Sequence, residues 1–246
     1  MFNKMIKKND SLYIQYKKDF DANNHINLEY IKRVFDFAYE MTFGASGQHR
    51  NHRSGGTHQR RNGEIFCDTF QGKISEFAIF QFFKDNLSIS EPDLQTYGLG
   101  KWDTFDFSIN GKVISVKSTK HYGNLLLLET KDWNLQGQYI PNYNENIDYV
   151  ILVRIKDEVT NLLKANKLYY SDKIDKELLW NLLKDISCAF DIPGYITGED
   201  LIYLINNRFV IRRGERLNAS TVMDAENYYC QAGDMHNIEK LMEEIK

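Results

Sequence analysis

The feature that most constrains this chain is a pair of short β-type segments joined by the dipeptide Asn110-Gly111. The first segment reads TFDFSI (residues 104–109) and the second reads KVISVK (residues 112–117). Asn-Gly is typical of a two-residue type I′ turn between antiparallel strands. The sequence therefore predicts a hairpin whose register is counted outward from the turn, with Ile109 opposite Lys112.

This register divides the hairpin into an apolar face and a polar face, because side chains alternate along a strand and opposed residues project from the same side. The predicted apolar face consists of Phe105, Phe107, Ile109, Ile114 and Val116. The predicted polar face consists of Asp106, Ser108, Val113, Ser115 and Lys117. A shift by one residue would move aromatic side chains to the polar side, so we expect Asp106, Ser115 and Lys117 to lie close together.

The composition is that of an ordinary globular protein. With 42% hydrophobic residues, 26% charged residues and three prolines in 246 residues, it excludes disordered and collagen-like chains. Cys67, Cys188 and Cys230 are far apart and odd in number, so we expect half-buried reduced thiols and neither a disulfide framework nor a cysteine zinc site. No apolar run approaches the roughly 20 residues of a membrane helix, and no signal peptide follows the basic start. We therefore expect a cytoplasmic protein with no membrane partner.

The spacing of apolar residues predicts helices in both halves of the chain. Residues 28–41 form an amphipathic pattern that Asn27 or His25 could open, and a more apolar helix is expected to begin near Gly72 and run to Leu87. Further helices are predicted over the C-terminal segments 175–186, 198–207 and 235–246.

The remaining apolar segments indicate a sheet. Residues 147–155 are a nearly continuous β-branched run, which predicts a strand buried on both faces. Residues 123–133 fit either a strand or a helix, and residues 162–170 are equally ambiguous. We predict a single α/β domain over residues 1–246, with a mixed central sheet flanked by helices and a helical elaboration from about residue 160 to residue 246.

Two glutamates are candidates to join the polar face of the hairpin. Glu76 shares a helix face with Ile79, Phe80 and Phe83, so its carboxylate is carried on an apolar stripe. Leaving a buried carboxylate unpaired costs roughly several kcal/mol. A metal ion, a lysine or a backbone donor is therefore expected near Glu76. Glu129 follows four leucines after the hairpin. Acidic oxygens gathered beside a lysine are what a Mg²⁺ site for phosphodiester hydrolysis requires.

An acidic helix, an aspartate, a short hairpin and a strand that ends in a lysine together resemble the PD-(D/E)XK nucleases, over residues from about 70 to 155. The resemblance implies a restriction-endonuclease-like fold and the activity of a type II restriction endonuclease. Such an enzyme uses Mg²⁺ and no organic cofactor to cut double-stranded DNA at a specific sequence. A homodimer is expected because two-fold protein symmetry matches a palindromic site.

The resemblance also implies roles for single residues. Asp106 would be the metal-ligating aspartate, Lys117 the lysine beside the attacking water, and Glu76 an accessory metal ligand on the helix. Ser115 stands where the usual second acid would be, as in the SVK variant, in which a glutamate further along supplies the missing carboxylate. Glu129 matches that role in spacing, so it is the third predicted metal ligand.

Two alternatives remain open. One is a DNA repair or junction-resolving nuclease with the same chemistry. The other is a non-catalytic DNA-binding module, in which Asp106 and Lys117 form only a surface ion pair worth under about 1 kcal/mol.

Local charge indicates where DNA would bind, since the net charge of −3 does not. A basic loop over residues 44–63 has no Asp or Glu, and its histidines fit no standard zinc spacing. Arginine presents a planar fork to guanine edges and to phosphate. The predicted DNA-binding residues are Arg50, Arg53, Arg60 and Arg61 in this loop, and Arg212 and Arg213 in a second basic cluster that includes Arg208 and Arg216.

Overall fold

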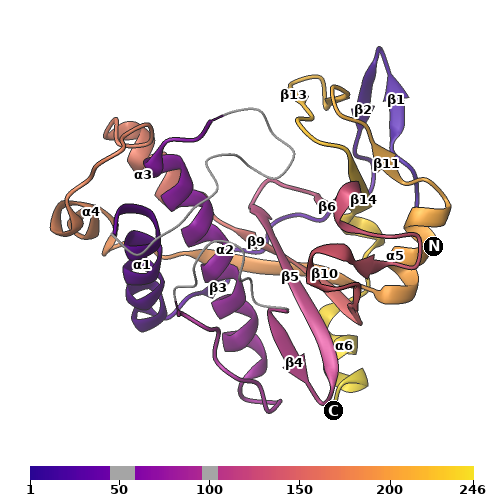
Figure 1. Cartoon of the computed structure of the whole chain (residues 1–246), viewed down its shortest axis with the longest axis horizontal. Helices are drawn as coiled ribbons and strands as arrows, with labels where there is room; N and C mark the ends of the chain where they lie inside the picture. The colour runs from indigo at the N-terminus through magenta and orange to yellow at the C-terminus, as the bar shows by residue number, and fades with distance from the viewer. Residues whose placement is uncertain (45–58, 96–104) are drawn as a thin grey trace.

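The computed structural model describes residues 1–44, 59–95 and 105–246 and shows a mixed α/β protein (Figure 1). Its main sheet has five strands, in the spatial order β3 (Asn24–His25), β10 (Ala189–Thr197), β9 (Tyr149–Ile155), β5 (Lys112–Lys120) and β4 (Phe107–Ile109). Strands β5 and β9 run parallel, and the other neighbours are antiparallel. The predicted mixed central sheet is therefore confirmed.

Three smaller sheets surround this one. The first contains β1 (Ile6–Lys8), β2 (Ser11–Tyr13), β12 (Arg216–Leu217) and β13 (Thr221–Val222). The second contains β11 (Val210–Ile211), β14 (Asn227–Gln231) and β6 (Leu125–Glu129), and the third contains β7 (Gln138–Tyr139) and β8 (Glu145–Asn146). The ambiguous leucine-rich segment is therefore a strand, β6.

The described ranges contain six α-helices. They are α1 (Leu28–Phe43), α2 (Asn62–Phe83), α3 (Glu158–Ala165), α4 (Lys176–Leu183), α5 (Gly198–Asn206) and α6 (Ile238–Glu244). Short 3-10 turns occur at Thr130–Asp132, Ile140–Asn142 and Ala232–Asp234. The predicted helices at α1, α4, α5 and α6 are confirmed. None of the helices in these ranges is long and apolar enough to span a lipid bilayer.

Strand β9 separates two hydrophobic cores. Tyr149, Ile151 and the other odd-numbered residues of β9 pack against α1 and α2, while Val150 and Leu152 pack against β6, β14 and α5. Every residue of β9 is buried. The prediction of a strand buried on both faces is confirmed, and helices cover the main sheet on the side of the first core.

The hairpin has the predicted register. Phe107 pairs with Ile114, Ser108 with Val113, and Ile109 with Lys112. Asn110 and Gly111 adopt φ values of 49° and 76°, as a type I′ turn requires. One part of the prediction is wrong: Phe105 is 36% exposed, because β4 begins only at Phe107 and does not carry Phe105 over the core.

Replacing Gly111 with valine is expected to destabilise the protein by about 1–2 kcal/mol, because a β-branched residue adopts a positive φ only with strain. Urea unfolding would measure the loss. Gly72→Ala is a suitable control, since a Cβ at this helical position meets no atom within 4 Å and should stabilise the helix. Equal midpoints for Gly111→Val and the wild type would contradict the turn assignment.

Other expectations need correction. Helix α2 begins at Asn62, ten residues before Gly72, so the end of the predicted basic loop is helical. The segment from about residue 160 is not only helical, because β10 lies inside the main sheet and β11–β14 follow it. The three cysteines are free, but they are fully buried and not half-buried. Burial raises the pKa of the Cys67 thiol to about 12.

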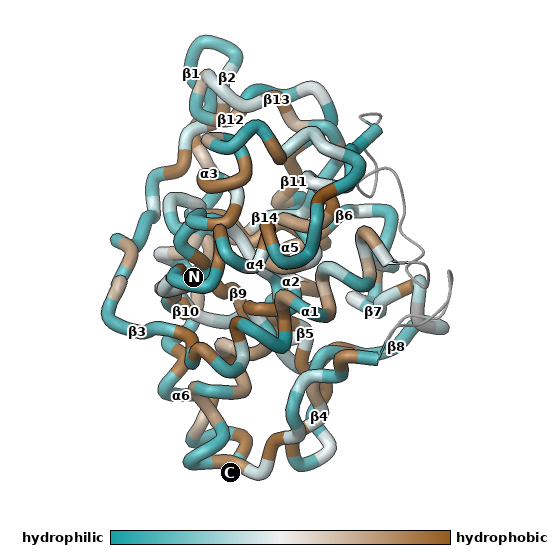
Figure 2. The backbone as a smooth tube through the Cα atoms, turned by 90° about the vertical axis from the view of Figure 1, so that its left-hand side faces the viewer, coloured by the Kyte–Doolittle hydropathy of each residue, from teal (hydrophilic) through white to brown (hydrophobic). Residues whose placement is uncertain are grey.

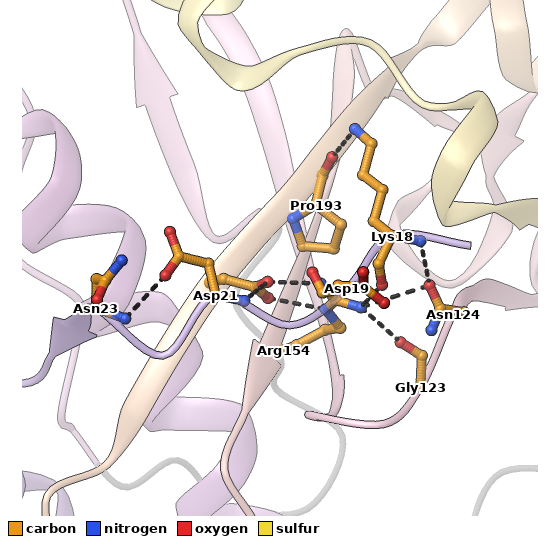
Figure 3. A network of polar contacts seen from close by, with 9 residues as sticks. Lys18, Asp19, Asp21, Asn23, Gly123, Asn124, Arg154 and Pro193 are labelled. Carbon is orange, nitrogen blue, oxygen red and sulfur yellow. Dashed lines mark hydrogen bonds and ion pairs between the residues drawn. The ribbon is translucent and has the colours of Figure 1, made fainter. Parts of the chain in front are cut away.

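A buried ion pair fastens the N-terminal segment to the main sheet (Figure 3). Arg154 of β9 is 1% exposed, and its guanidinium donates to both carboxylate oxygens of Asp191 on β10, at 2.8 and 2.5 Å. The same guanidinium donates to the backbone carbonyls of Lys18 and Asp19, at 2.7 Å each. Asp191 also accepts the backbone N–H of Asp21. These contacts hold residues 18–21 across the ends of β9 and β10.

Candidate active site

Asp106 lies at the edge of β5, just before β4 begins. Its carboxylate accepts a hydrogen bond from the backbone N–H of Val116 at 2.6 Å and one from the hydroxyl of Ser115 at 3.2 Å. The carboxylate thus takes the place that a longer β4 would occupy beside β5. The predicted proximity of Asp106 and Ser115 is confirmed.

Lys117 lies on the same face of β5 as Ser115, because the two residues are two positions apart on one strand. Its side chain is partly exposed. Lys117 has no ion pair and no side-chain hydrogen bond with any residue in the described part of the chain. In particular, Asp106 and Lys117 do not form the ion pair that the non-catalytic alternative assumes. The Asp106 carboxylate is instead hydrogen-bonded to Val116 and Ser115.

A cavity of about 330 Å³ lies beside β5. Among the described residues, β4 pairs only with the first residues of β5, as far as Ile114. The cavity is lined by Gly72, Ser75 and Glu76 of α2, Val116, Lys117, Ser118 and Thr119 of β5, Leu125 and Leu127 of β6, and Leu152 of β9. It therefore brings a carboxylate from α2 and an amine from β5 to a common space.

Glu76 has a lysine as its partner, which is one of the three kinds of partner expected for a carboxylate on an apolar helix face. Lys73, one turn earlier on α2, approaches the Glu76 carboxylate to 2.7 Å. The two side chains are only 13% and 15% exposed. Lys73 was not predicted as this partner, although residues three positions apart on a helix are neighbours.

Glu129 ends β6 and is paired with Asn227 of β14. Like Asp106, it is not a lining residue of the cavity. Lys131 approaches its carboxylate to 2.8 Å. Figure 1 shows β6 running away from β5 toward β14. Leu127, two residues earlier, does line the cavity, so β6 contributes an apolar wall where the sequence suggested a carboxylate.

The predicted metal ligands are not assembled as a set. Within residues 1–44, 59–95 and 105–246, no group of three or more His, Cys, Asp and Glu side chains is placed to hold a metal ion. Mg²⁺ commonly takes only one or two carboxylates from a protein and completes its shell with water and substrate phosphates. Asp106 and Glu76 are carboxylates of the kind that such binding uses.

The predicted DNA-binding arginines have different surroundings. Arg50 and Arg53 lie outside the described residues. Arg60 is ion-paired with Asp68 at 2.8 Å, and Arg61 with Asp172 at 2.6 Å, so both have a carboxylate partner at the start of α2. By contrast, Arg212 and Arg213 are exposed in the turn that follows β11.

Comparison of the chain with protein-family models, with curated proteins and with solved structures finds no match. The function is therefore inferred from the geometry of the cavity and of the hairpin beside it.

Proposed function

We propose that this protein is a Mg²⁺-dependent type II restriction endonuclease that hydrolyses phosphodiester bonds of double-stranded DNA. The observation that carries the proposal is the placement of Lys117, an amine without an ion-pair partner among the described residues, in a cavity that also contains the Glu76 carboxylate. Asp106, whose carboxylate is hydrogen-bonded to the lining residue Val116, would supply a second carboxylate.

Asp106 and Glu76 would hold Mg²⁺, which when bound polarises the scissile phosphate and lowers the pKa of a bound water. Glu76 would exchange Lys73 for the metal ion. Glu129 remains an alternative second ligand, and it would have to leave Lys131 and reorient toward the cavity.

The chain's own groups would position the reacting atoms. The Lys117 amine would orient the attacking water, take up a proton at Nζ when it is unprotonated, and offset negative charge on the phosphorus centre when it is protonated. Ser115 and the Val116 N–H would hold the Asp106 carboxylate in one orientation. The apolar wall formed by Leu125 and Leu127 would limit the access of other water molecules.

The lack of an Asp106–Lys117 ion pair favours catalysis over a purely structural role. A salt bridge on a sheet face would satisfy both charges and leave neither for a ligand. Here the Asp106 carboxylate is oriented by two hydrogen bonds, while the Lys117 amine in the cavity has no ion-pair partner among the described residues.

Incubation of supercoiled plasmid with the protein, with and without Mg²⁺, tests the proposal. Discrete linear fragments that depend on Mg²⁺ are the expected result. Nicking, or cutting only at junctions, would replace restriction with a repair or junction-resolving activity. Intact plasmid over a range of Mg²⁺ and Mn²⁺ concentrations and plasmid sequences would overturn the nuclease assignment, and sedimentation of the same sample would test the proposed homodimer.

A further inference from the structure

A second feature of the molecule is a small sheet that gathers basic residues from two distant parts of the chain. Strand β2, near the N-terminus, pairs in parallel with β12, so Ser11 lies beside Arg216. Residues 1–17 and 208–224, here called the basic sheet, contain eight Lys and Arg and three Asp and Glu, a net charge of +5. The rest of the chain carries −8. The fold thus concentrates positive charge in an acidic protein.

The cations of the basic sheet are all exposed. They are Lys4, Lys7, Lys8, Lys17, Arg208, Arg212, Arg213 and Arg216. Among the described residues, only Lys7 of this set has a carboxylate within ion-pair distance, Glu215 at 3.7 Å. Like charges held together repel each other unless a ligand of opposite charge is bound. The charge pattern therefore fits a polyanion.

The strand register places two of these cations, Lys8 and Arg216, in line across the small sheet. Lys8, Ser11, Arg216 and Val222 lie side by side on four neighbouring strands. Lys8 and Arg216 are separated by two strand spacings, about 10 Å, with the small, buried Ser11 between them. This distance is close to the width of the major groove of DNA, about 12 Å, across which phosphates face each other.

Arg212 and Arg213 extend this surface from the turn between β11 and β12. The turn is held by two hydrogen bonds of 2.8 Å, one from Gly214 N–H to the Met223 carbonyl and one from Arg212 N–H to the Glu215 carboxylate. Gly214 has a φ of +84°, a conformation that favours glycine. The two guanidinium groups are therefore carried on an ordered turn.

The basic sheet is also fixed to the body of the protein. Leu12 and Leu217 pack against the second hydrophobic core. Gln231 is completely buried, and its amide accepts the Gln15 N–H and donates to the Asn3 carbonyl, at 2.8 Å each. Figure 2 shows the β1–β2 hairpin at the outer end of the molecule, with a largely hydrophilic tip. A surface that is already ordered loses little conformational entropy when a ligand binds.

We infer that the basic sheet binds the phosphate backbone of double-stranded DNA, an inference that rests on the proposed function for the identity of its partner. The basic sheet would hold the duplex in position by electrostatic attraction to its phosphates. Cleavage would occur at the separate cavity beside β5. Because phosphate contacts carry no sequence information, this surface would contribute affinity and orientation and not specificity.

Fluorescence anisotropy with a labelled DNA duplex of about 30 base pairs, without divalent metal, tests this inference at salt concentrations from about 50 to 200 mM. The variant combines Lys8→Ala, Arg212→Ala, Arg213→Ala and Arg216→Ala. Its affinity is expected to fall about 10- to 100-fold, and the slope of log K against log salt to become shallower by about 3–4, since each lost phosphate contact removes about 0.9.

The control variant removes four exposed lysines outside the basic sheet, Lys164, Lys173, Lys184 and Lys240, each replaced by alanine. It should keep the wild-type slope. If the four-alanine variant unfolds, Arg212→Ala and Arg213→Ala are measured singly, and each should lower the slope by about 1.

Two outcomes would overturn the inference: no duplex binding by the wild type, or equal losses in both variants. Because binding is measured without metal, the result is independent of cleavage. A protein that binds through the basic sheet but never cuts DNA would disprove the proposed nuclease and leave the docking surface standing.

Discussion

Lys117→Ala is expected to abolish detectable plasmid cleavage, a loss of about 10²–10⁴-fold or more, while DNA binding stays close to that of the wild type. The reason is that Lys117 lines the cavity and has no counter-ion among the described residues, so its amine is available to the reacting phosphate and water. Single-turnover cleavage and metal-free anisotropy, measured on the same preparation, would separate the chemical step from binding.

Lys112→Ala provides the matched control. Lys112 lies on the same strand, is exposed, and is ion-paired with Asp148 at 2.9 Å. Its removal should leave the cleavage rate within about twofold of that of the wild type, because an exposed ion pair contributes little to stability. Turnover like that of the wild type in Lys117→Ala would end the nuclease proposal, and equal losses in both variants would indicate a nonspecific effect of charge.

Asp191→Ala is expected to lower the free energy of unfolding by about 3–5 kcal/mol, because it leaves the Arg154 guanidinium buried without its carboxylate. Arg154 is 1% exposed and also holds the Lys18 and Asp19 carbonyls. The variant should therefore loosen the N-terminal segment as well as the sheet. Urea unfolding would measure the stability, and limited proteolysis would detect cleavage near residues 18–21.

An exposed pair serves as the comparison for this prediction. Arg33 and Glu91 approach to 2.7 Å, but their side chains are 34% and 46% exposed, so Glu91→Ala should cost under about 1 kcal/mol. The double variant Arg154→Met with Asp191→Leu should recover much of the lost stability, because no unpaired charge is then buried. A cost for Asp191→Ala as small as that for Glu91→Ala would show that the buried pair contributes little.

The parts of the fold that were predicted correctly depend on neighbours in the sequence. Asn110-Gly111 defines its own turn, and the alternation on either side defines the register that places Asp106 beside Ser115. In helix α1 the apolar residues recur at helical spacing, which identifies an amphipathic helix. In strand β9 they form an almost unbroken run, which identifies a strand buried on both faces. Each of these patterns lies within a short stretch of about ten residues or a little more, so it can be recognised without knowledge of the tertiary structure.

The parts that were missed depend on distant segments. The start of α2 was missed because Asn62 and Gly63 end a segment rich in glycines and arginines, yet Gly63 donates to the Ser171 carbonyl and Glu64 is buried. Strand β10 contains Pro193 and Gly194 at a bulge, which interrupts the strand pattern in the sequence. Glu129 ends a strand, β6, that pairs with β14 about a hundred residues later, which spacing along the chain does not reveal.

The short β4 has a consequence for the behaviour of the protein in solution. Beyond Ile114, in the part of the chain that the structure describes, no strand pairs with the edge of β5 that faces away from β9. An uncovered strand edge invites another molecule to add a strand, and lysines on such an edge discourage that association. Lys117 and Lys120 both lie on this stretch. The residue proposed to promote hydrolysis would therefore also discourage strand addition at this edge, and its removal would favour aggregation during purification.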